Sequence, residues 1–186
     1  MSSITVDQVK TGYVLFYKGH TFLSKSIEYF MKLFGIKHKI STEWIPSHMG
    51  TIFIEDDLVK IGESVWPRYK INDFNSNYQK NFIIMKPIED FTSKEQEIGK
   101  KYILELSAKG GYQWWKYPAY IWYVWTGRKE LFNKKQSDWN TVCYESSTRV
   151  IIKMRSSLMP ENYNTEEAIC FDVLDNPKFE IIIDKR

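Results

Sequence analysis

The sequence predicts a single α+β domain over residues 1–186, in which an antiparallel sheet packs against helices. Strand patterns follow one another in hairpin-like succession, and three amphipathic or capped segments predict helices. No internal repeat, low-complexity tract or Pro/Gly-rich linker divides the chain. A chain of 186 residues is long enough to bury one sizeable core, so no second domain is needed to explain the length.

The first half of the chain predicts a strand, a helix, a hairpin and a further strand. "YVLFYKG" (13–19) is a short apolar run ended by a glycine, as is typical of a buried strand. Thr21 then caps a helix with one apolar face, which Gly35 ends. "MGTIFIEDDLVKIGES" (49–64) predicts a hairpin around an acidic turn, and "NFIIMKPI" (81–88) predicts another strand.

The second half predicts two more helices and a final strand. Ser93 with Gln96 forms a capping box that opens a helix to about Ala108, where two glycines follow. Asn140 or Thr141 caps a helix that runs to about Met154, and "KFEIIIDKR" (178–186) predicts the last strand.

Composition narrows the class of protein. The chain is 43% hydrophobic and 26% charged, which is ordinary for a soluble globular protein, and its net charge is only +3. Nucleic acid is therefore not expected as the main partner. No secretory signal or membrane-spanning run is visible, so we expect a cytoplasmic protein, or one of the host-cell cytoplasm if the gene is viral. We expect its two cysteines to be free thiols, and we expect no metal or cofactor.

Cys143 is the candidate nucleophile. It lies in "WNTVCYESSTR" (139–149), inside the first turn of the predicted helix, where free backbone N–H groups and the helix dipole favour a thiolate. The same N–H groups could receive the oxyanion of a tetrahedral intermediate. A lone cysteine is more often an inert core residue, and Cys170, in the apolar strand-like run "AICFDVL", fits that description.

His48 and Glu63 complete the candidate site. His20 and His38 read most simply as solvated loop residues, whereas His48 stands where a loop meets a strand. A hairpin turn centred on Glu55-Asp56 places His48 opposite Glu63, where the carboxylate can fix the imidazole tautomer and leave the other nitrogen to accept the thiol proton. A turn at Asp56-Asp57 would instead place Val65 opposite His48, and the sequence leaves both turns open.

The order His, acid, Cys resembles that of the circularly permuted papain-fold hydrolases. This group includes the YiiX-like and NlpC-type amidases and peptidases, and the lecithin retinol acyltransferase-like enzymes. "TGYVLFYKGHTFLSKSIEYF" (11–30), "SHMGTIFIEDDLVKIGES" (47–64) and "CYESS" (143–147) carry the resemblance. Two positions depart from the family: Tyr13 stands where Asp often follows Gly, and Tyr144 replaces the Ser after the nucleophile.

The resemblance implies a permuted papain-like fold, with the nucleophile at a helix N-terminus. It also implies Cys143 as nucleophile, His48 as general base and Glu63 as the orienting group. The family attacks amides, peptides, esters or thioesters through an acyl-enzyme, so the expected partner is a peptide, an amide or a lipid acyl substrate.

The aromatic segment "YQWWKYPAYIWYVW" (112–125) leaves alternatives open. Its rings are typical of core packing, but they also fit a lipid chain, peripheral contact with a membrane, or stacked bases of a single strand. The main rival to an enzyme is therefore an inactive papain-like fold that binds lipid, peptide or single-stranded nucleic acid.

Overall fold

The computed structural model describes residues 4–18, 25–26, 28–29, 32–33, 44–74, 81–113, 116, 118, 122, 126, 139–168 and 170–186. Most of the helix expected over 21–35, most of the segment 112–125, His20 and His38 lie outside these ranges; the described residues 25–26, 28–29 and 32–33 are helical. Among the described residues, no helix is long and apolar enough to cross a membrane.

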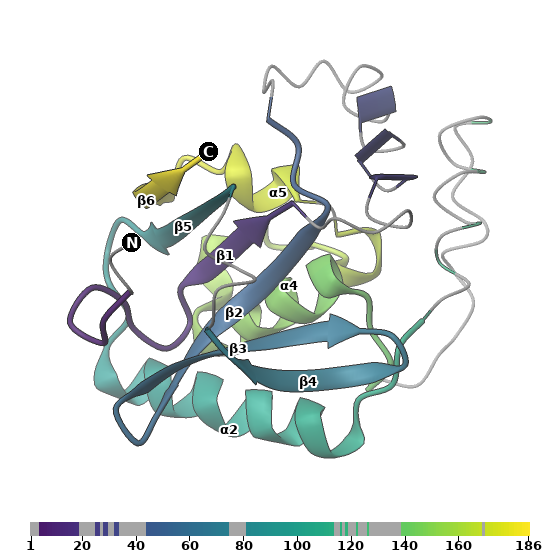
Figure 1. Ribbon diagram of the computed structural model, residues 1–186. Coiled ribbons are helices and arrows are strands. Elements are labelled where there is room, and N and C mark those ends of the chain that lie inside the picture. Colours follow the sequence, from purple (N-terminus) through teal and green to yellow (C-terminus); the bar gives the residue numbers. More distant parts are fainter. Residues whose placement is uncertain are drawn as a thin grey trace.

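A six-stranded antiparallel sheet is the centre of the structure (Figure 1). Its spatial order is β4-β3-β2-β1-β5-β6. The strands are β1 (Val14–Tyr17), β2 (His48–Glu55), β3 (Leu58–Val65), β4 (Arg68–Asp73), β5 (Phe82–Pro87) and β6 (Phe179–Lys185). The antiparallel sheet and the packed helices confirm the predicted α+β class.

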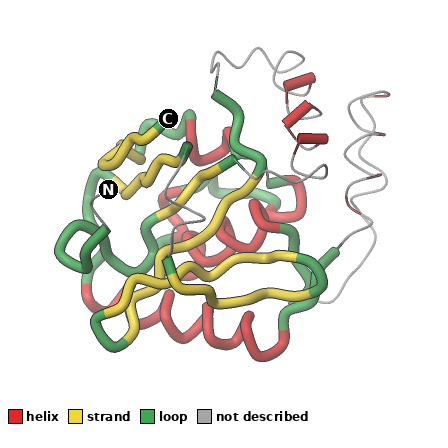
Figure 2. Tube along the Cα trace, in the orientation of Figure 1, coloured by secondary structure: helices red, strands yellow, loops and turns green. Residues whose placement is uncertain are grey.

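Helices α2 (Ser93–Lys109) and α4 (Cys143–Met154) run beside the sheet, and the tube trace shows the same two layers (Figure 2). Three shorter elements follow α4: η1 (Ser156–Leu158), η2 (Thr165–Glu167) and α5 (Phe171–Leu174). Cys170 therefore precedes a short helix, and the strand-like reading of "AICFDVL" is wrong. Ala168, Cys170, Phe171 and Val173 are nevertheless buried, because one turn of helix can bury such a run as well as a strand can.

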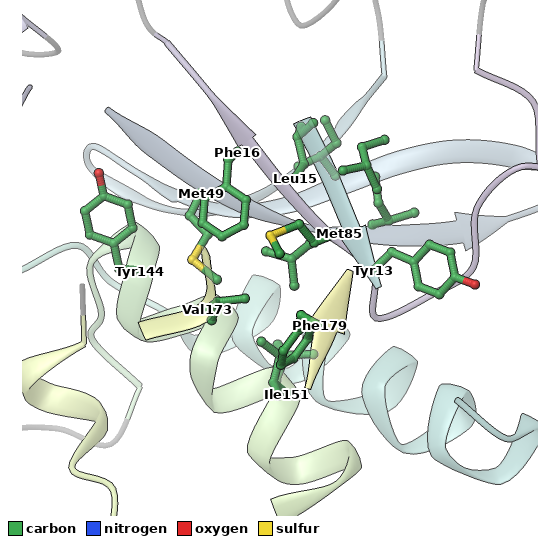
Figure 3. Close-up of a cluster of buried hydrophobic side chains, with 14 of the residues drawn as sticks. Tyr13, Leu15, Phe16, Met49, Met85, Tyr144, Ile151, Val173 and Phe179 are labelled. Carbon is green, nitrogen blue, oxygen red and sulfur yellow. The ribbon is translucent and has the colours of Figure 1, made fainter. Parts of the chain in front are cut away.

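The core lies between the sheet and the helices. Figure 3 shows Phe16, Met49 and Met85 from the sheet gathered with Tyr144 and Ile151 of α4. The two long helices approach closely: a Cβ on Gly99 of α2 would lie 2.5 Å from the sulfur of Met154. A side chain at this position would require the end of the Met154 side chain to move, so glycine lets Met154 pack closely against α2.

The capping box of α2 is one residue earlier than predicted. Thr92 is the N-cap, its side chain accepts from the Glu95 N–H, and Glu95 accepts from the Thr92 N–H. The sequence matches the capping-box pattern at Thr92/Glu95 and at Ser93/Gln96 alike. Thr92 is the N-cap because its backbone is extended, whereas Ser93 already has helical backbone.

The capping prediction for α4 is wrong. Val142 is the N-cap and no side chain caps it among the described residues, so Cys143 is the first helical residue rather than the third. The predicted caps are engaged elsewhere: the Asn140 amide oxygen accepts from the Gly111 N–H, and the Thr141 hydroxyl hydrogen bonds Ser64. The sequence analysis also missed β4, a partly polar edge strand that follows the turn at Pro67.

Candidate active site

The β2–β3 hairpin places His48 and Glu63 on one face of the sheet. The turn is at Asp56 and Asp57, both with left-handed backbone (φ 52° and 57°), and Glu55 pairs with Leu58. The predicted Glu55-Asp56 turn is therefore wrong, and the alternative is correct. The observed register of β2 against β3 differs from the predicted one by two residues along β3. His48 and Glu63 are therefore diagonal neighbours on the same face of the sheet.

The two side chains meet despite the altered register. Nε2 of His48 lies 3.1 Å from Oε2 of Glu63. When the ring is protonated, this contact is a close ion pair. The His48 side chain is 14% exposed and that of Glu63 is 2% exposed, so water screens the pair weakly.

Two further strands hold the Glu63 carboxylate. The Tyr17 hydroxyl of β1 donates to Oε2 at 2.6 Å, and the Asn72 amide of β4 donates to Oε1 at 2.8 Å. Tyr17 also pairs directly with His48 across the sheet, and their ring centroids are 5.0 Å apart. Four adjacent strands thus contribute one side chain each to a single polar cluster, and both carboxylate oxygens are fixed.

Two hydrogen bonds hold the N-terminus of α4 at the end of the hairpin where His48 lies. The Tyr144 hydroxyl donates to the Pro46 carbonyl at 2.9 Å, two residues before His48. The hydroxyls of Ser64 and Thr141 lie 2.6 Å apart. Cys143, between these two anchors, is within hydrogen-bonding range of the His48 ring. Since Nε2 faces Glu63, Nδ1 is the nitrogen left for the thiol.

The surroundings of His48 favour its imidazolium form. Burial alone lowers the pKa of His48, but the charge and hydrogen bond of Cys143, together with Glu63, outweigh it and raise the pKa to about 10. Cys143 on one side and the carboxylate on the other both stabilise the protonated ring. The arrangement therefore favours the imidazolium form of His48.

A second buried ion-pair network begins two residues after Cys143. The carboxylate of Glu145 accepts from Lys116 Nζ at 2.6 Å and from Arg149 at 2.7 Å, and the side chains of Glu145 and Lys116 are fully buried. Lys116 also donates to the Glu166 carbonyl at 3.2 Å. The sequence analysis did not single out Lys116 or Glu145, because a lysine inside an aromatic segment gives no sign of its partner.

The two cysteines differ in their surroundings. Both are free thiols and both are buried, but only Cys143 lies beside a base. Burial raises the pKa of Cys170 well above its usual range, and the charges of Asp172 and Cys143 raise it further. Cys170 is therefore held as an unreactive neutral thiol.

The structure brings together Cys143, His48 and Glu63, the three residues singled out from the sequence; their catalytic roles stay predictions. Tyr17 and Asn72 were missed. The register of β1 against β2 and of β3 against β4 is what places them beside the site, and the sequence carries no local sign of either register. Among the described residues, no group of three or more His, Cys, Asp or Glu side chains could hold a metal ion.

Comparison of folds gives one informative neighbour. A solved structure described as the metalloprotein yiiX from Escherichia coli O157:H7 matches with a TM-score of 0.61 and 14% sequence identity, over 95% of this chain and 98% of that one. No protein-family model matches the sequence. No curated protein matches it either. The chain thus shares the YiiX-like fold, in agreement with the α+β, papain-like architecture expected from the sequence.

Proposed function

We propose that this protein is a cysteine hydrolase that works through an acyl-enzyme on Cys143. The observation that carries the proposal is the convergence of three groups: a thiol at a helix N-terminus, an imidazole within its hydrogen-bonding range, and a buried carboxylate 3.1 Å from the other ring nitrogen. This is the geometry of nucleophile, base and orienting group. The YiiX-like fold is compatible with such a site.

In the proposed first step, the Cys143 thiolate attacks the acyl carbon of an amide, ester or thioester. The carbon–sulfur bond forms, and the tetrahedral intermediate collapses as the bond to the leaving group breaks. The His48 imidazolium gives its proton to the departing amine, alcohol or thiol. In the second step, neutral His48 takes a proton from water, the water oxygen attacks the thioester, and the acid leaves as the thiolate returns.

The start of α4 can stabilise the oxyanion of both intermediates. Val142 has no side chain that caps the helix among the described residues, so no capping oxygen competes for the N–H groups of the first turn. Those N–H groups carry the positive end of the helix dipole and lie at the nucleophile. Glu63 acts through His48: with Tyr17 and Asn72 fixing both its oxygens, it holds the ring with Nδ1 toward the sulfur.

The substrate class divides along the family branches that the resemblance names. An amidase or peptidase of the NlpC type would cleave a peptide or isopeptide bond, whereas a branch like lecithin retinol acyltransferase would act on a lipid ester or thioester. Segment 112–125 bears on this choice, and its described residues differ: Lys116 is buried, whereas Trp122 is 40% exposed. An exposed ring is compatible with an acyl chain.

The first test is the selectivity of alkylation. Wild-type protein is treated with iodoacetamide near pH 6, and the adducts are mapped by mass spectrometry. We expect Cys143 to be labelled first and Cys170 to remain free, because only Cys143 has an imidazolium partner. Equal labelling, or faster labelling of Cys170, would contradict the proposal. Unfolding the protein in denaturant provides the control, since both thiols should then react alike.

The second test is turnover. Rates are measured on a short-chain and a long-chain aryl thioester, both below their micelle concentrations, and on a peptide library, with wild type and Cys143→Ala. If 112–125 binds an acyl chain, the longer thioester is cleaved severalfold faster, since each buried methylene contributes up to about 0.8 kcal/mol. Equal rates with clean peptide cleavage would indicate an amidase or peptidase.

One observation favours the alternative, a papain-like fold that only binds its ligand. Cys143 is 3% exposed, so a substrate needs an opening to reach the sulfur. Absence of turnover above the Cys143→Ala background on every substrate, together with slow alkylation of Cys143, would favour a binding module for lipid, peptide or single-stranded nucleic acid.

A further inference from the structure

A pocket lies between helices α2 and α4, away from the candidate nucleophile. Its volume is about 400 Å³, within the usual range for small-molecule sites. We call it the α2–α4 pocket. It is lined by Tyr102, Trp139, Arg149, Ile152, Lys153 and Thr165.

The pocket is separated from Cys143 both around and along α4. With about 3.6 residues per turn, Cys143 points in the same direction as Val150 and Met154, which are buried. Ile152 points the opposite way, whereas the exposed Lys153 is about 80° around the helix from Cys143 and about 15 Å farther along it. A ligand in this pocket would therefore not contact the sulfur, and the pocket is a site separate from the one described above.

Two aromatic rings line the pocket. The ring centroids of Tyr102 and Trp139 are 6.3 Å apart and the rings are tilted by 39°. Both side chains are partly exposed rather than buried in the core. Two such rings at the wall of a pocket offer an apolar surface on which another planar ring can stack.

Cations surround these rings. Lys109 Nζ lies 4.4 Å from the centroid of the Trp139 ring, and Lys153 Nζ lies 5.7 Å from that of Tyr102. Neither lysine forms an ion pair with any of the described residues. The Arg149 guanidinium hydrogen bonds the Tyr102 hydroxyl and also pairs with Glu145.

Two carboxylates act on these groups. Glu145 is paired with Lys116 as well as with Arg149. Glu105 of α2 acts on Tyr102 together with Glu145. Lys109 and Lys153 form no ion pair among the described residues, so their ammonium groups lie beside the rings without a carboxylate partner there. A guanidinium and an ammonium at the mouth of a small pocket are suited to a phosphate.

We propose that the α2–α4 pocket binds a small anionic ligand with a planar ring, of the mononucleotide class. The ring stacks on Trp139 and Tyr102, and the phosphate is bound by Arg149 and Lys153. The proposal is independent of catalysis at Cys143, because it rests on none of the three residues Cys143, His48 and Glu63.

The experiment is isothermal titration calorimetry of the full chain with AMP at low and moderate salt. Adenosine and inorganic phosphate are titrated separately as the two halves of the ligand. Trp139→Leu removes the stacking surface, and Lys153→Glu reverses one charge on an exposed residue. Matched controls are Trp66→Leu, at a tryptophan that is 69% exposed in the β3–β4 turn, and Lys101→Glu, on an exposed position of α2.

We expect AMP to bind to wild type and to Cys143→Ala alike, and more tightly than either adenosine or phosphate. Trp139→Leu and Lys153→Glu should each weaken binding about tenfold or more, the usual effect of losing a stacked ring or a phosphate contact. The two control variants should bind as wild type does. Lys153→Glu keeps the test decisive if Trp139→Leu unfolds the protein.

Three results would overturn the proposal. The first is no heat of binding at millimolar AMP, and the second is AMP binding that both pocket variants leave unchanged. The third is phosphate binding as tightly as AMP, which would indicate a site for charge alone. Since Cys143→Ala is expected to bind normally, failure here does not bear on the proposed hydrolase, and loss of hydrolysis does not bear on the pocket.

Discussion

Replacing Glu63 with glutamine tests whether this carboxylate sets the charge of His48. Gln keeps the size of the side chain and an oxygen for Asn72, but it removes the negative charge 3.1 Å from Nε2. A contact that involves a charged group is worth about 1.5–3 kcal/mol. Because one pKa unit corresponds to about 1.4 kcal/mol, we expect the pKa of His48 to fall by about 1–2 units from its raised value.

The same energy predicts a change in thiol reactivity. If Glu63 contributes about 1.5–3 kcal/mol to holding the ring of His48 protonated beside Cys143, we expect the rate of Cys143 alkylation near pH 6 to fall about tenfold to a hundredfold in Glu63→Gln. The assay follows the rate of Cys143 alkylation against pH, together with the imidazole signal of His48 in an NMR titration. His48→Gln identifies that signal among the three histidines.

Glu145→Gln is the matched control. Glu145 is also a buried carboxylate in two ion pairs, but its partners are Lys116 and Arg149. The Glu145→Gln variant should have a lower free energy of unfolding, but the pKa of His48 should not fall. The reasoning is refuted if Glu63→Gln leaves the His48 titration and the alkylation rate unchanged, or if Glu145→Gln changes them equally. In the first case Glu63 is purely structural, and in the second the effect belongs to any buried charge near α4.

Three other predictions concern the surroundings of the site. Tyr17→Phe removes the hydroxyl 2.6 Å from Glu63 and should slow alkylation of Cys143, although less than Glu63→Gln does. It should also lower the free energy of unfolding in denaturant by about 1–3 kcal/mol. An unchanged alkylation rate would show that Tyr17 does not position Glu63. Lys116→Met leaves Glu145 buried with one partner fewer and should lower the free energy of unfolding by about 3–5 kcal/mol. Adding Glu145→Leu should restore most of this loss. A loss below about 1 kcal/mol would argue against the fully buried pair. The pKa of His48 is raised in the folded state, so its contribution to stability is complete below about pH 6.5 and is lost as the pH rises toward about 10. Over this range the thermal midpoint of wild type should therefore fall relative to that of His48→Gln. Parallel curves of thermal midpoint against pH would contradict the raised pKa.

The hairpin shows how far a pattern in the sequence can lead. The alternation of apolar and polar residues indicated the two strands, and the acidic run indicated the turn, but not which two residues formed it. Asp56 and Asp57 take the left-handed backbone, so the turn that pairs His48 directly with Glu63, at Glu55 and Asp56, is not the one formed. His48 and Glu63 still lie on the same face of the sheet, because the predicted and observed registers differ by an even number of residues, and such a shift keeps every side chain on its own face.

The sequence by itself determined the α+β class, most of the strands and the presence of a helix around Cys143 to Met154, and it singled out three residues whose catalytic roles stay predictions. Each of these predictions follows from a local pattern in the sequence: the alternation of a strand, the capping residues of a helix, or a cysteine followed by polar residues.

Only the tertiary structure decided what surrounds the site. Tyr17 and Asn72 reach Glu63 because four strands are aligned in a particular register, and Lys116 meets Glu145 across 29 residues of chain. The α2–α4 pocket likewise needs two helices and the chain before Cys143 to come together. Such contacts depend on packing between distant segments, and no local pattern encodes that packing. The caps predicted for α4 were wrong for the same reason. Asn140 and Thr141 have side chains that can cap a helix, but they hydrogen bond the distant residues Gly111 and Ser64 instead.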